Sequence, residues 1–140
     1  QLFDTWACLL TPSEYRDFSL HYIQQICDAL TAYNKPIILF SKHSQHFVEQ
    51  QLILPIDAIS IDTHYSLEDA RKKVGKGITL QGNLNPELLL GDVSTLEFTV
   101  KSILNTMKND PAYIFNLGHG ILPPTPLDNV QRVVDLVKHA

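Results

Sequence analysis

Short apolar runs alternate along this chain with longer stretches in which apolar residues recur every three or four positions. The run Pro36–Phe40 is continuous and rich in isoleucine, and Asp57–Ile61 and Tyr113–Phe115 have a similar character. Runs this short are typical of strands buried on both faces of a parallel sheet. Gln1–Asp4 and Ile78–Gln81 fit the same description, so the pattern predicts five strands.

The longest helix is predicted over Tyr15–Tyr33. Thr11 can cap it, Pro12 suits its first position, and Glu14 completes a capping box with Thr11. Its apolar residues recur at steps of three and four, which predicts one buried face made of Phe18, Tyr22, Ile26, Ala29, Leu30 and Tyr33.

A helix is predicted after every strand that follows. These helices begin at residues that cap or start helices, namely Ser44, Ser66, Asn85, Ser94 and Pro126. The predicted ranges are Gln45–Leu52, Leu67–Val74, a short helix to Leu90, a longer one to about Lys108, and Leu127–His139. Strict alternation of strands and helices predicts an α/β fold with an all-parallel sheet and right-handed crossovers.

Composition narrows the class of protein. The chain has 140 residues, of which 44% are hydrophobic and 19% charged, enough for one ordinary core. The net charge of -4 comes without a run of Lys or Arg, so we expect no nucleic-acid partner. No apolar stretch approaches the roughly 20 residues of a membrane span, and no signal peptide is evident, so we expect no membrane partner and a cytoplasmic location. Cys8 and Cys27 are interpreted as reduced, buried thiols.

The first residues, beginning with Gln1, have the pattern of the interior of a strand, so we expect the chain to be part of a longer parent protein.

Polar side chains follow the end of every predicted strand. Because the carboxyl ends of parallel strands meet at one rim, residues far apart in sequence are expected to be neighbours there. A capping or turn role is the alternative for each single residue. The residues are Asp4, Thr5, Ser41, Lys42, His43, Asp62, His64, Gln81, Asn83, Asn116 and His119.

The segment after the last strand has the most distinctive chemistry. His119 stands between Gly118 and Gly120, and three prolines follow within six residues. Glycines on both sides let the backbone adopt unusual conformations and let a ligand approach the imidazole. The alternative is a tight turn with His119 as a solvated loop residue.

Other chemistries lack a motif. The chain contains no dinucleotide, nucleoside triphosphate or serine hydrolase signature. His43 and His46 could form a metal pair, but they have no thiol or third histidine beside them in the sequence. We therefore interpret them as structural or exposed and predict no metal site. The hydroxyl, amide and imidazole donors of the rim suit an anionic substrate.

Three segments are specific enough to indicate a family. Residues 1–7 (QLFDTWA), 81–86 (QGNLNP) and 115–120 (FNLGHG) resemble successive motifs of uroporphyrinogen decarboxylase, in the same order. This family forms a TIM barrel, and the resemblance covers only its carboxyl-terminal part. It implies that the five strands are barrel strands four to eight, and that residues 1–140 form a single partial domain with an incomplete barrel.

The resemblance also implies a function. Family members remove the carboxyl groups of the four acetate side chains of uroporphyrinogen III without a cofactor, giving coproporphyrinogen III in haem biosynthesis, and a homodimer is expected. Thr5 and His119 occupy substrate-binding positions, and the possible cleft-lining residues are Asp62, Gln81, Asn83 and Asn116. The family's arginine loop and central aspartate lie upstream of Gln1. No catalytic residue is therefore assigned, and the isolated chain is predicted to be inactive.

The chain departs from the family pattern at Cys8, His43-Ser44, Thr63 and Asn85, where the family usually has glycine, a glycine-rich turn, tryptophan and aspartate. One alternative is a corrinoid-type methyltransferase of the same superfamily. Those proteins hold zinc through a histidine-x-cysteine pair and a later cysteine, and neither cysteine here is placed that way. The other alternative is a non-catalytic barrel fragment.

Overall fold

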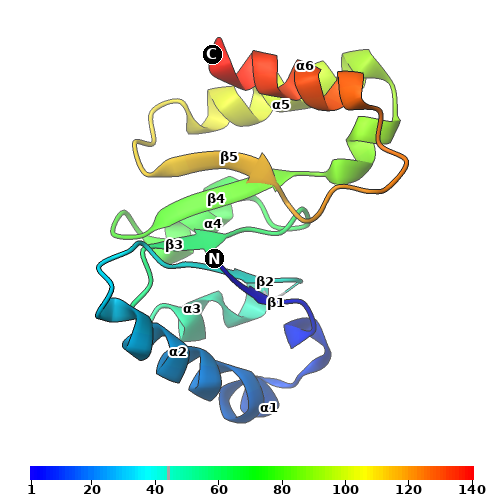
Figure 1. Cartoon of the computed structure of the whole chain (residues 1–140). Coiled ribbons are helices and arrows are strands. Elements are labelled where there is room, and N and C mark those ends of the chain that lie inside the picture. Colours follow the sequence, from blue (N-terminus) through cyan, green and yellow to red (C-terminus); the bar gives the residue numbers. More distant parts are fainter. Residues whose placement is uncertain (44) are drawn as a thin grey trace.

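The computed structural model describes residues 1–43 and 45–140. Its centre is a five-stranded sheet in which every pair of neighbours is parallel and the spatial order follows the chain order (Figure 1). This confirms the predicted all-parallel α/β fold. The strands are β1 (Leu2–Asp4), β2 (Ile38–Ser41), β3 (Ala58–Ser60), β4 (Thr79–Leu84) and β5 (Tyr113–Leu117).

Helices connect all the strands. At one end of the sheet, α1, α2 and α3 lie beside β1 and β2, and at the other end α5 and α6 lie beyond β5 (Figure 1). The helices are α1 (Pro12–Tyr15), α2 (His21–Thr31), α3 (Val48–Gln51), α4 (Leu67–Val74), α5 (Val93–Met107) and α6 (Leu127–Lys138), with a π-helical turn Arg16–Leu20 and short 3₁₀ segments Ala7–Leu9, Gln45–Phe47 and Pro86–Leu90. No helix of the described residues is long and apolar enough to span a membrane.

One row of residues across the sheet forms the core. Strand register aligns Leu2, Leu39, Ile59, Leu80 and Tyr113. The three central members are at most 2% exposed, and all five belong to the main hydrophobic cluster or pack against it. Because side chains alternate along a strand, the next residue of each strand must face the opposite side.

That opposite row is less apolar, and its two end members are exposed. It runs through Phe3, Phe40, Ser60, Gln81 and Ile114. Phe3 is 70% exposed although it lies in a strand. This row therefore faces a hollow and not the layer of helices.

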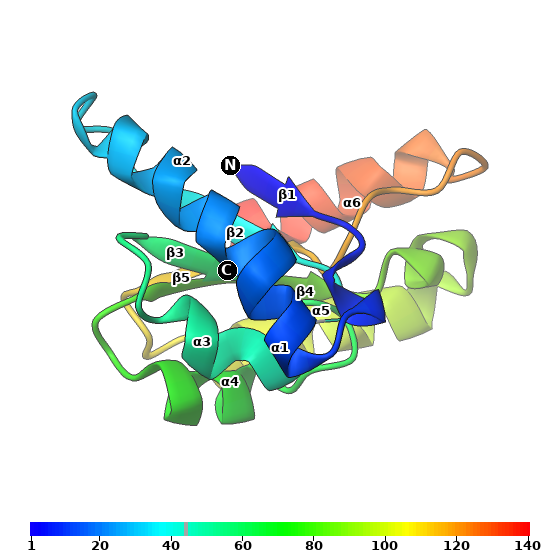
Figure 2. The ribbon, with the colours of Figure 1, turned by 90° about the horizontal axis from the view of Figure 1, so that it is seen from below.

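The sheet is curved toward this second row. The side-chain amide of Gln81 in β4 donates to the side-chain oxygen of Gln1, just before β1, at 3.4 Å. In a flat sheet β1 and β4 would be three strand spacings apart, about 14 Å. The contact therefore requires the curvature of a barrel wall. Among the described residues β1 and β5 each pair with one strand only, so the sheet is an open part of a barrel (Figure 2).

The predicted helix starts are mostly confirmed. Thr11 and Glu14 form the capping box, and Ser66 caps α4 by accepting a hydrogen bond from Asp69 N at 3.3 Å. The prediction for α5 was wrong by two residues, because Asp92 and not Ser94 caps it by accepting from Thr95 N at 2.9 Å. The predicted cap Ser44 lies outside the described residues.

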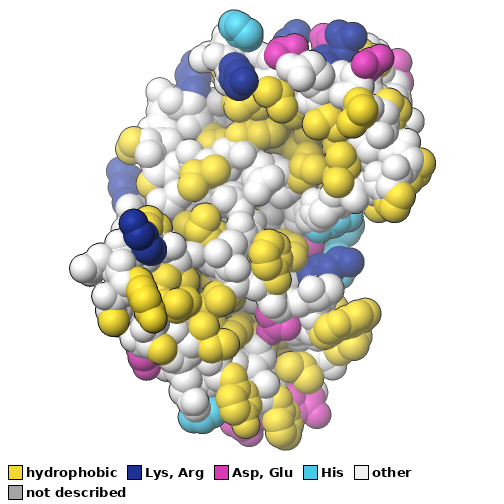
Figure 3. Space-filling view, in the orientation of Figure 1, with side chains coloured by type: hydrophobic (Ala, Val, Ile, Leu, Met, Phe, Trp, Pro, Cys, Tyr) yellow, Lys and Arg dark blue, Asp and Glu magenta, His cyan; other side chains and the backbone are white. Residues whose placement is uncertain are grey.

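The predicted buried face of the first long helix was wrong except at Leu30, which is partly buried and packs against the main core. Phe18, Tyr22, Ile26 and Tyr33 are 46–71% exposed, and the buried positions are Tyr15, Leu20, Ile23 and Cys27. The buried residues are spaced by five across the π-helical turn and then by three and four. Leu20, Ile23, Cys27 and Leu30 form a second apolar stripe at regular helical spacing, and this stripe belongs to the main core or packs against it. The extra residue of the π-helical turn brings Tyr15 onto the same side. Hydrophobic side chains are visible on the surface over α1 and α2 (Figure 3).

Two strands are longer than predicted. β4 continues through Gly82 and Asn83 to Leu84, and β5 continues through Asn116 to Leu117. Pairing between β4 and β5 extends over Gly82–Phe115, Asn83–Asn116 and Leu84–Leu117. Backbone pairing with a neighbour therefore overrides the low strand preference of Gly and Asn.

Tyr113 links β5 to β4 through its side chain. Its hydroxyl donates to the carbonyl of Gly82. Burial raises the pKa of Tyr113 because the phenolate would lose its hydration. Folding therefore favours the protonated phenol, and this contribution to stability is present below the ordinary tyrosine pKa of about 10 and is lost as the pH rises above it.

We expect Tyr113→Phe to make stability less dependent on alkaline pH. Urea unfolding midpoints measured from pH 8 to 11 should fall less steeply for this variant than for the native chain, because one ionisable group is removed. Tyr33→Phe, at a side chain that is 71% exposed, is the control and should keep the native slope. Equal slopes for the native chain and Tyr113→Phe would contradict the assignment.

Candidate functional site

A cleft opens on the concave side of the sheet, at the carboxyl ends of the strands. Its volume is about 640 Å³. β1, β2, β3, β5 and the loop after β5 contribute its lining, which is Gln1, Phe3, Thr5, Phe40, Lys42, Ser60, Asn116, Leu117, His119, Gly120 and Ile121. Segments more than 100 residues apart thus meet in one hollow, as the parallel sheet predicted.

The lining has the chemistry of an anion site with an apolar floor. None of the described residues that line the cleft is acidic. Lys42 is a cation and His119 can become one, while Thr5 and Asn116 offer hydrogen-bond donors. Phe3 and Phe40 lie edge to face with ring centroids 6.0 Å apart and provide the apolar part of the lining.

His119 is oriented by its own loop. Its Nδ1 donates to the carbonyl of Gly120 at 3.1 Å, which leaves Nε2 as the ring nitrogen that can face a ligand. The loop is anchored by Gly118, whose backbone N–H donates to the carbonyl of Leu84 at 2.8 Å. Gly118 is buried against Thr63 of the loop after β3.

Thr5 and Asn116 stand at opposite ends of the strand order and line the same cleft. The side-chain oxygen of Asn116 accepts a hydrogen bond from the backbone N–H of Leu117 at 2.8 Å. This orients the amide so that its NH₂ group can donate to a ligand. Thr5 is exposed just after β1, so its hydroxyl is accessible.

Gln81 lies beneath the cleft and not in its lining. It is 4% exposed, and its amide donates to Ser60 at 3.2 Å as well as to Gln1. Both partners line the cleft. Gln81 therefore supports the polar part of the floor.

Asp62 and Asn83 are engaged in the loop after β3. The amide of Asn83 donates to the carbonyls of Asp62 at 3.0 Å and Tyr65 at 2.6 Å. The Asp62 carboxylate is buried and accepts from the backbone N–H groups of His43 and His64 at 3.4 and 3.1 Å. The structure thus brings Thr5, Asn116 and His119 together in the cleft. Asp62 and Asn83, which were predicted to line it, are not among its lining residues and form hydrogen bonds around the loops after β2 and β3.

Lys42 lines the cleft, although the sequence indicated it only as one of the polar residues at the strand ends and not as a substrate-binding or cleft-lining residue. It follows Phe40 by two positions, and Phe40 belongs to the concave row. The two-residue period of strands would have placed Lys42 on the same side. Along β1 the same alternation places Phe3 and Thr5 on the cleft side and Asp4 on the other. The Asp4 carboxylate accepts a hydrogen bond from the hydroxyl of Ser19.

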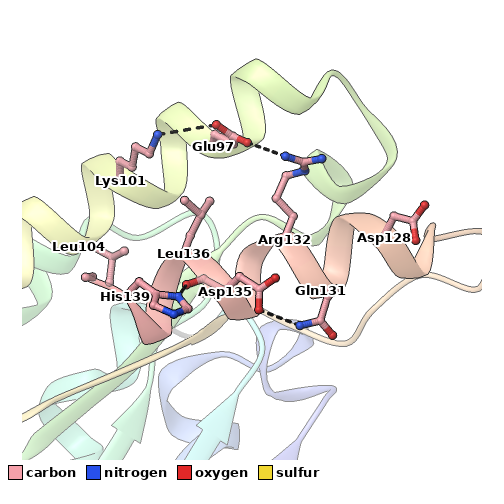
Figure 4. Close-up of a pocket in the computed structure, with 10 residues that line it drawn as sticks. Glu97, Lys101, Leu104, Asp128, Gln131, Arg132, Asp135, Leu136 and His139 are labelled. Carbon is pink, nitrogen blue, oxygen red and sulfur yellow. Dashed lines mark hydrogen bonds and ion pairs between the residues drawn. The ribbon is translucent and has the colours of Figure 1, made fainter.

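A second hollow lies between α5 and α6, in the outer layer of helices (Figure 4). Three of its charged groups bind one another, since Glu97 lies 2.9 Å from Arg132 and 3.6 Å from Lys101. Gln131 likewise donates to Asp135 at 2.8 Å. These groups are already paired and lie away from the strand ends, so the concave cleft is the better candidate.

Five parallel β/α units with a polar cleft at the carboxyl ends of the strands define an open part of a TIM barrel. The family described as Uroporphyrinogen decarboxylase (URO-D) matches residues 1–140. The chain belongs to this family, as the sequence motifs predicted.

Comparison with known proteins supports this assignment. A uroporphyrinogen decarboxylase from Coxiella burnetii (strain Dugway 5J108-111) is 38% identical over 142 residues, which cover 99% of this chain and 39% of that protein. A uroporphyrinogen decarboxylase from Legionella pneumophila (strain Lens) is 40% identical over 138 residues, covering 97% and 39%. The chain therefore spans about two fifths of the length of the curated relatives it matches.

A solved structure shows the same fold. A methyltransferase from Methanosarcina mazei superimposes with a TM-score of 0.80 over 99% of this chain and 41% of that one, at 22% identity. At this identity the likeness shows the fold alone. It agrees with the predicted open part of a TIM barrel.

Proposed function

We propose that this chain forms the carboxyl-terminal part of a uroporphyrinogen decarboxylase, which converts uroporphyrinogen III to coproporphyrinogen III in haem biosynthesis without a cofactor. The supporting observation is the concave cleft. It places Lys42 and His119 beside hydrogen-bond donors, and no acidic side chain is among its described lining residues. A ligand with several carboxylate arms around a ring of linked pyrroles matches both the charge and the apolar floor.

Each group of the cleft has a distinct part in this proposal. Lys42 and protonated His119 bind carboxylate arms through charge-assisted hydrogen bonds, and Thr5 and Asn116 donate neutral ones. Phe3 and Phe40 support the face of the ring system. These contacts fix the orientation of the substrate. Correct orientation of the reacting groups accounts for a large share of the rate enhancement of enzymes.

Decarboxylation also needs a charge that this wall does not supply. When carbon dioxide leaves an acetate arm, the electron pair of the broken bond passes to a pyrrole ring whose carbon has first been protonated. The ring is positive in that state, so a nearby anion stabilises it. Because none of the described lining residues is acidic, we place this anion, and the arginines that complete the binding of the arms, in the upstream part of the parent protein.

The first test compares the chain with its parent. Purified residues 1–140 should show no turnover of uroporphyrinogen III, and activity should appear when a separately produced upstream part is added. Turnover by residues 1–140 alone would show that the catalytic anion lies in this chain. No turnover by the intact parent protein would refute the proposed reaction.

The second test concerns His119 in the parent protein. An imidazole attracts carboxylates only when it is protonated, so its contribution to binding should be largest at acid pH and should decline as the pH rises. His119→Asn keeps a hydrogen-bond donor without the charge. We expect its KM to rise about tenfold at pH 6 and to approach the native value at pH 8.

His139→Asn is the matched control, since this exposed residue lies on the outer helix layer and its ring bonds the carbonyl of Asp135 at 2.7 Å. It should leave KM unchanged at both pH values. A pH profile of His119→Asn parallel to the native one would return His119 to a purely structural role.

The proposal extends to the domain, the assembly and the location of the protein. Residues 1–140 form a single partial domain, the parent protein is a homodimer, and it acts in the cytoplasm. The exposed Phe18, Tyr22 and Tyr33 on the helix before β2 support a larger assembly, because such a stripe is usually covered in the complete protein. Size-exclusion chromatography of the parent with light scattering would test the homodimer.

A further inference from the structure

We propose that His43, Asp62 and His64 form a binding site for a divalent transition metal such as Zn²⁺. One ligand atom of each residue lies within 4.8 Å of the corresponding atoms of the other two. The residues come from the loops after β2 and β3, which are neighbouring strands. None of the three lines the substrate cleft, so this site is separate from the proposed decarboxylation.

The carboxylate of Asp62 is the fixed member of the site. It is 4% exposed, and both of its oxygens are held by backbone N–H groups, Oδ2 by that of His43 and Oδ1 by that of His64. The same two residues present their imidazoles to it. His43 Nε2 lies 3.7 Å from Asp62 Oδ2, and the two rings have centroids 5.1 Å apart.

The separation between His43 and Asp62 is close to what a metal requires. Zn–N and Zn–O bonds of about 2.0–2.2 Å place tetrahedral ligands roughly 3.4 Å apart. The distance from His43 to Asp62 exceeds this by only a few tenths of an ångström. His64 is exposed, so its side chain can rotate to complete the set without moving the backbone.

His43 has a backbone conformation that a loop residue seldom adopts. Its φ of 50° lies in the left-handed region, which a residue with a side chain enters at a cost. In this conformation its N–H reaches Asp62 while its ring stays beside the same carboxylate. The backbone N–H and the imidazole of His43 therefore both approach the carboxylate of Asp62.

The ligand set selects the class of metal. Two imidazoles and one carboxylate suit Zn²⁺, Co²⁺ and Ni²⁺, whereas Ca²⁺ and Mg²⁺ prefer oxygen ligands. Three protein ligands leave a fourth position for water. A bound ion would join the loops after β2 and β3 and thereby stabilise the rim of the sheet.

The histidine that lies near His43 in this cluster is His64, and not His46 as the sequence suggested. His46 is nearest to His43 in sequence among the histidines, yet it is not part of the cluster, and its ring lies against Phe47 with centroids 3.9 Å apart. The prediction of no metal site considered His43 and His46 as a pair. His64, twenty-one residues away from His43, supplies the second imidazole only through the pairing of β2 with β3.

The test is a titration of residues 1–140 with Co²⁺, followed by its visible absorption, and with Zn²⁺ by calorimetry. We expect one ion per chain, removed by EDTA. Loss of a group that only orients a ligand weakens metal binding by about 10 to 100-fold, so His64→Ala, which removes a ligand, should weaken it at least tenfold. His46→Ala is the matched control and should bind as the native chain does.

Thermal unfolding provides the second measurement. Zn²⁺ should raise the Tm of the native chain and of His46→Ala but not that of His64→Ala, which should fold because its altered side chain is exposed. Native affinity in His64→Ala, weakened binding in His46→Ala, or no binding by the native chain at millimolar Zn²⁺ would each overturn the proposal.

Discussion

Replacement of Gly118 by alanine is expected to destabilise the chain by about 3 kcal/mol, because the added methyl group has no room. A Cβ at this position would lie 2.5 Å from the backbone nitrogen of Thr63 and 2.8 Å from its Cα. Neither backbone can easily retreat, since Gly118 N donates to Leu84 O at 2.8 Å and Asn83 bonds the neighbouring carbonyl of Asp62. Urea unfolding of residues 1–140 would measure the loss.

Gly120→Ala is the matched control. It changes the other glycine beside His119, and a Cβ there would meet nothing within 4 Å. Its unfolding free energy should stay within about 0.5 kcal/mol of the native value. Equal effects of the two substitutions would mean that the loop after β5 is not packed against Thr63 as described.

Substitution of Arg71 by methionine is expected to have a similar effect, about 3 kcal/mol, through lost hydrogen bonds. The guanidinium of Arg71 donates to the carboxylate of Asp110 at 2.6 Å and to three carbonyls, those of Gly75, Ile78 and Ala112, at 2.5–2.9 Å. Both charged side chains are less than 20% exposed. Methionine has similar length but leaves these acceptors without a donor.

Arg132→Met serves as the comparison for a charged pair on the surface. Arg132 lies 2.9 Å from Glu97, but its side chain is 46% exposed, so the pair contributes about 0–1 kcal/mol. Thermal unfolding should separate the two variants clearly. Equal melting temperatures of Arg71→Met and Arg132→Met would mean that the hydrogen bonds of Arg71 do not hold α4 to the starts of β4 and β5.

The contrast between these two arginines shows where sequence reasoning ends. Arg71 lies in a helix rich in charged residues, and nothing in the pattern of that helix distinguishes it from a solvated cation. Its acceptors Asp110 and Ala112 follow about forty residues later. Only the packing of α4 beside the strands brings them together.

The cleft residues show the same division between local and long-range determinants. Strand ends at one rim could be predicted, because parallel strands always present their carboxyl ends together. That placed Thr5, Asn116 and His119 in one hollow. Asp62 and Asn83 satisfied the same rule, yet their side chains turn to the loop after β3, since nearby backbone groups needed partners.

The sequence by itself determined the elements, their order and the family, because these depend on local signals. The capping box of Thr11 and Glu14, the short apolar runs and the FNLGHG segment are each readable within a few residues. The tertiary structure decided which sides of the elements are used. It selected the buried face of the first long helix and brought His43 close to Asp62 and His64. Those outcomes depend on strand register and sheet curvature, which are set by contacts between residues far apart in the chain.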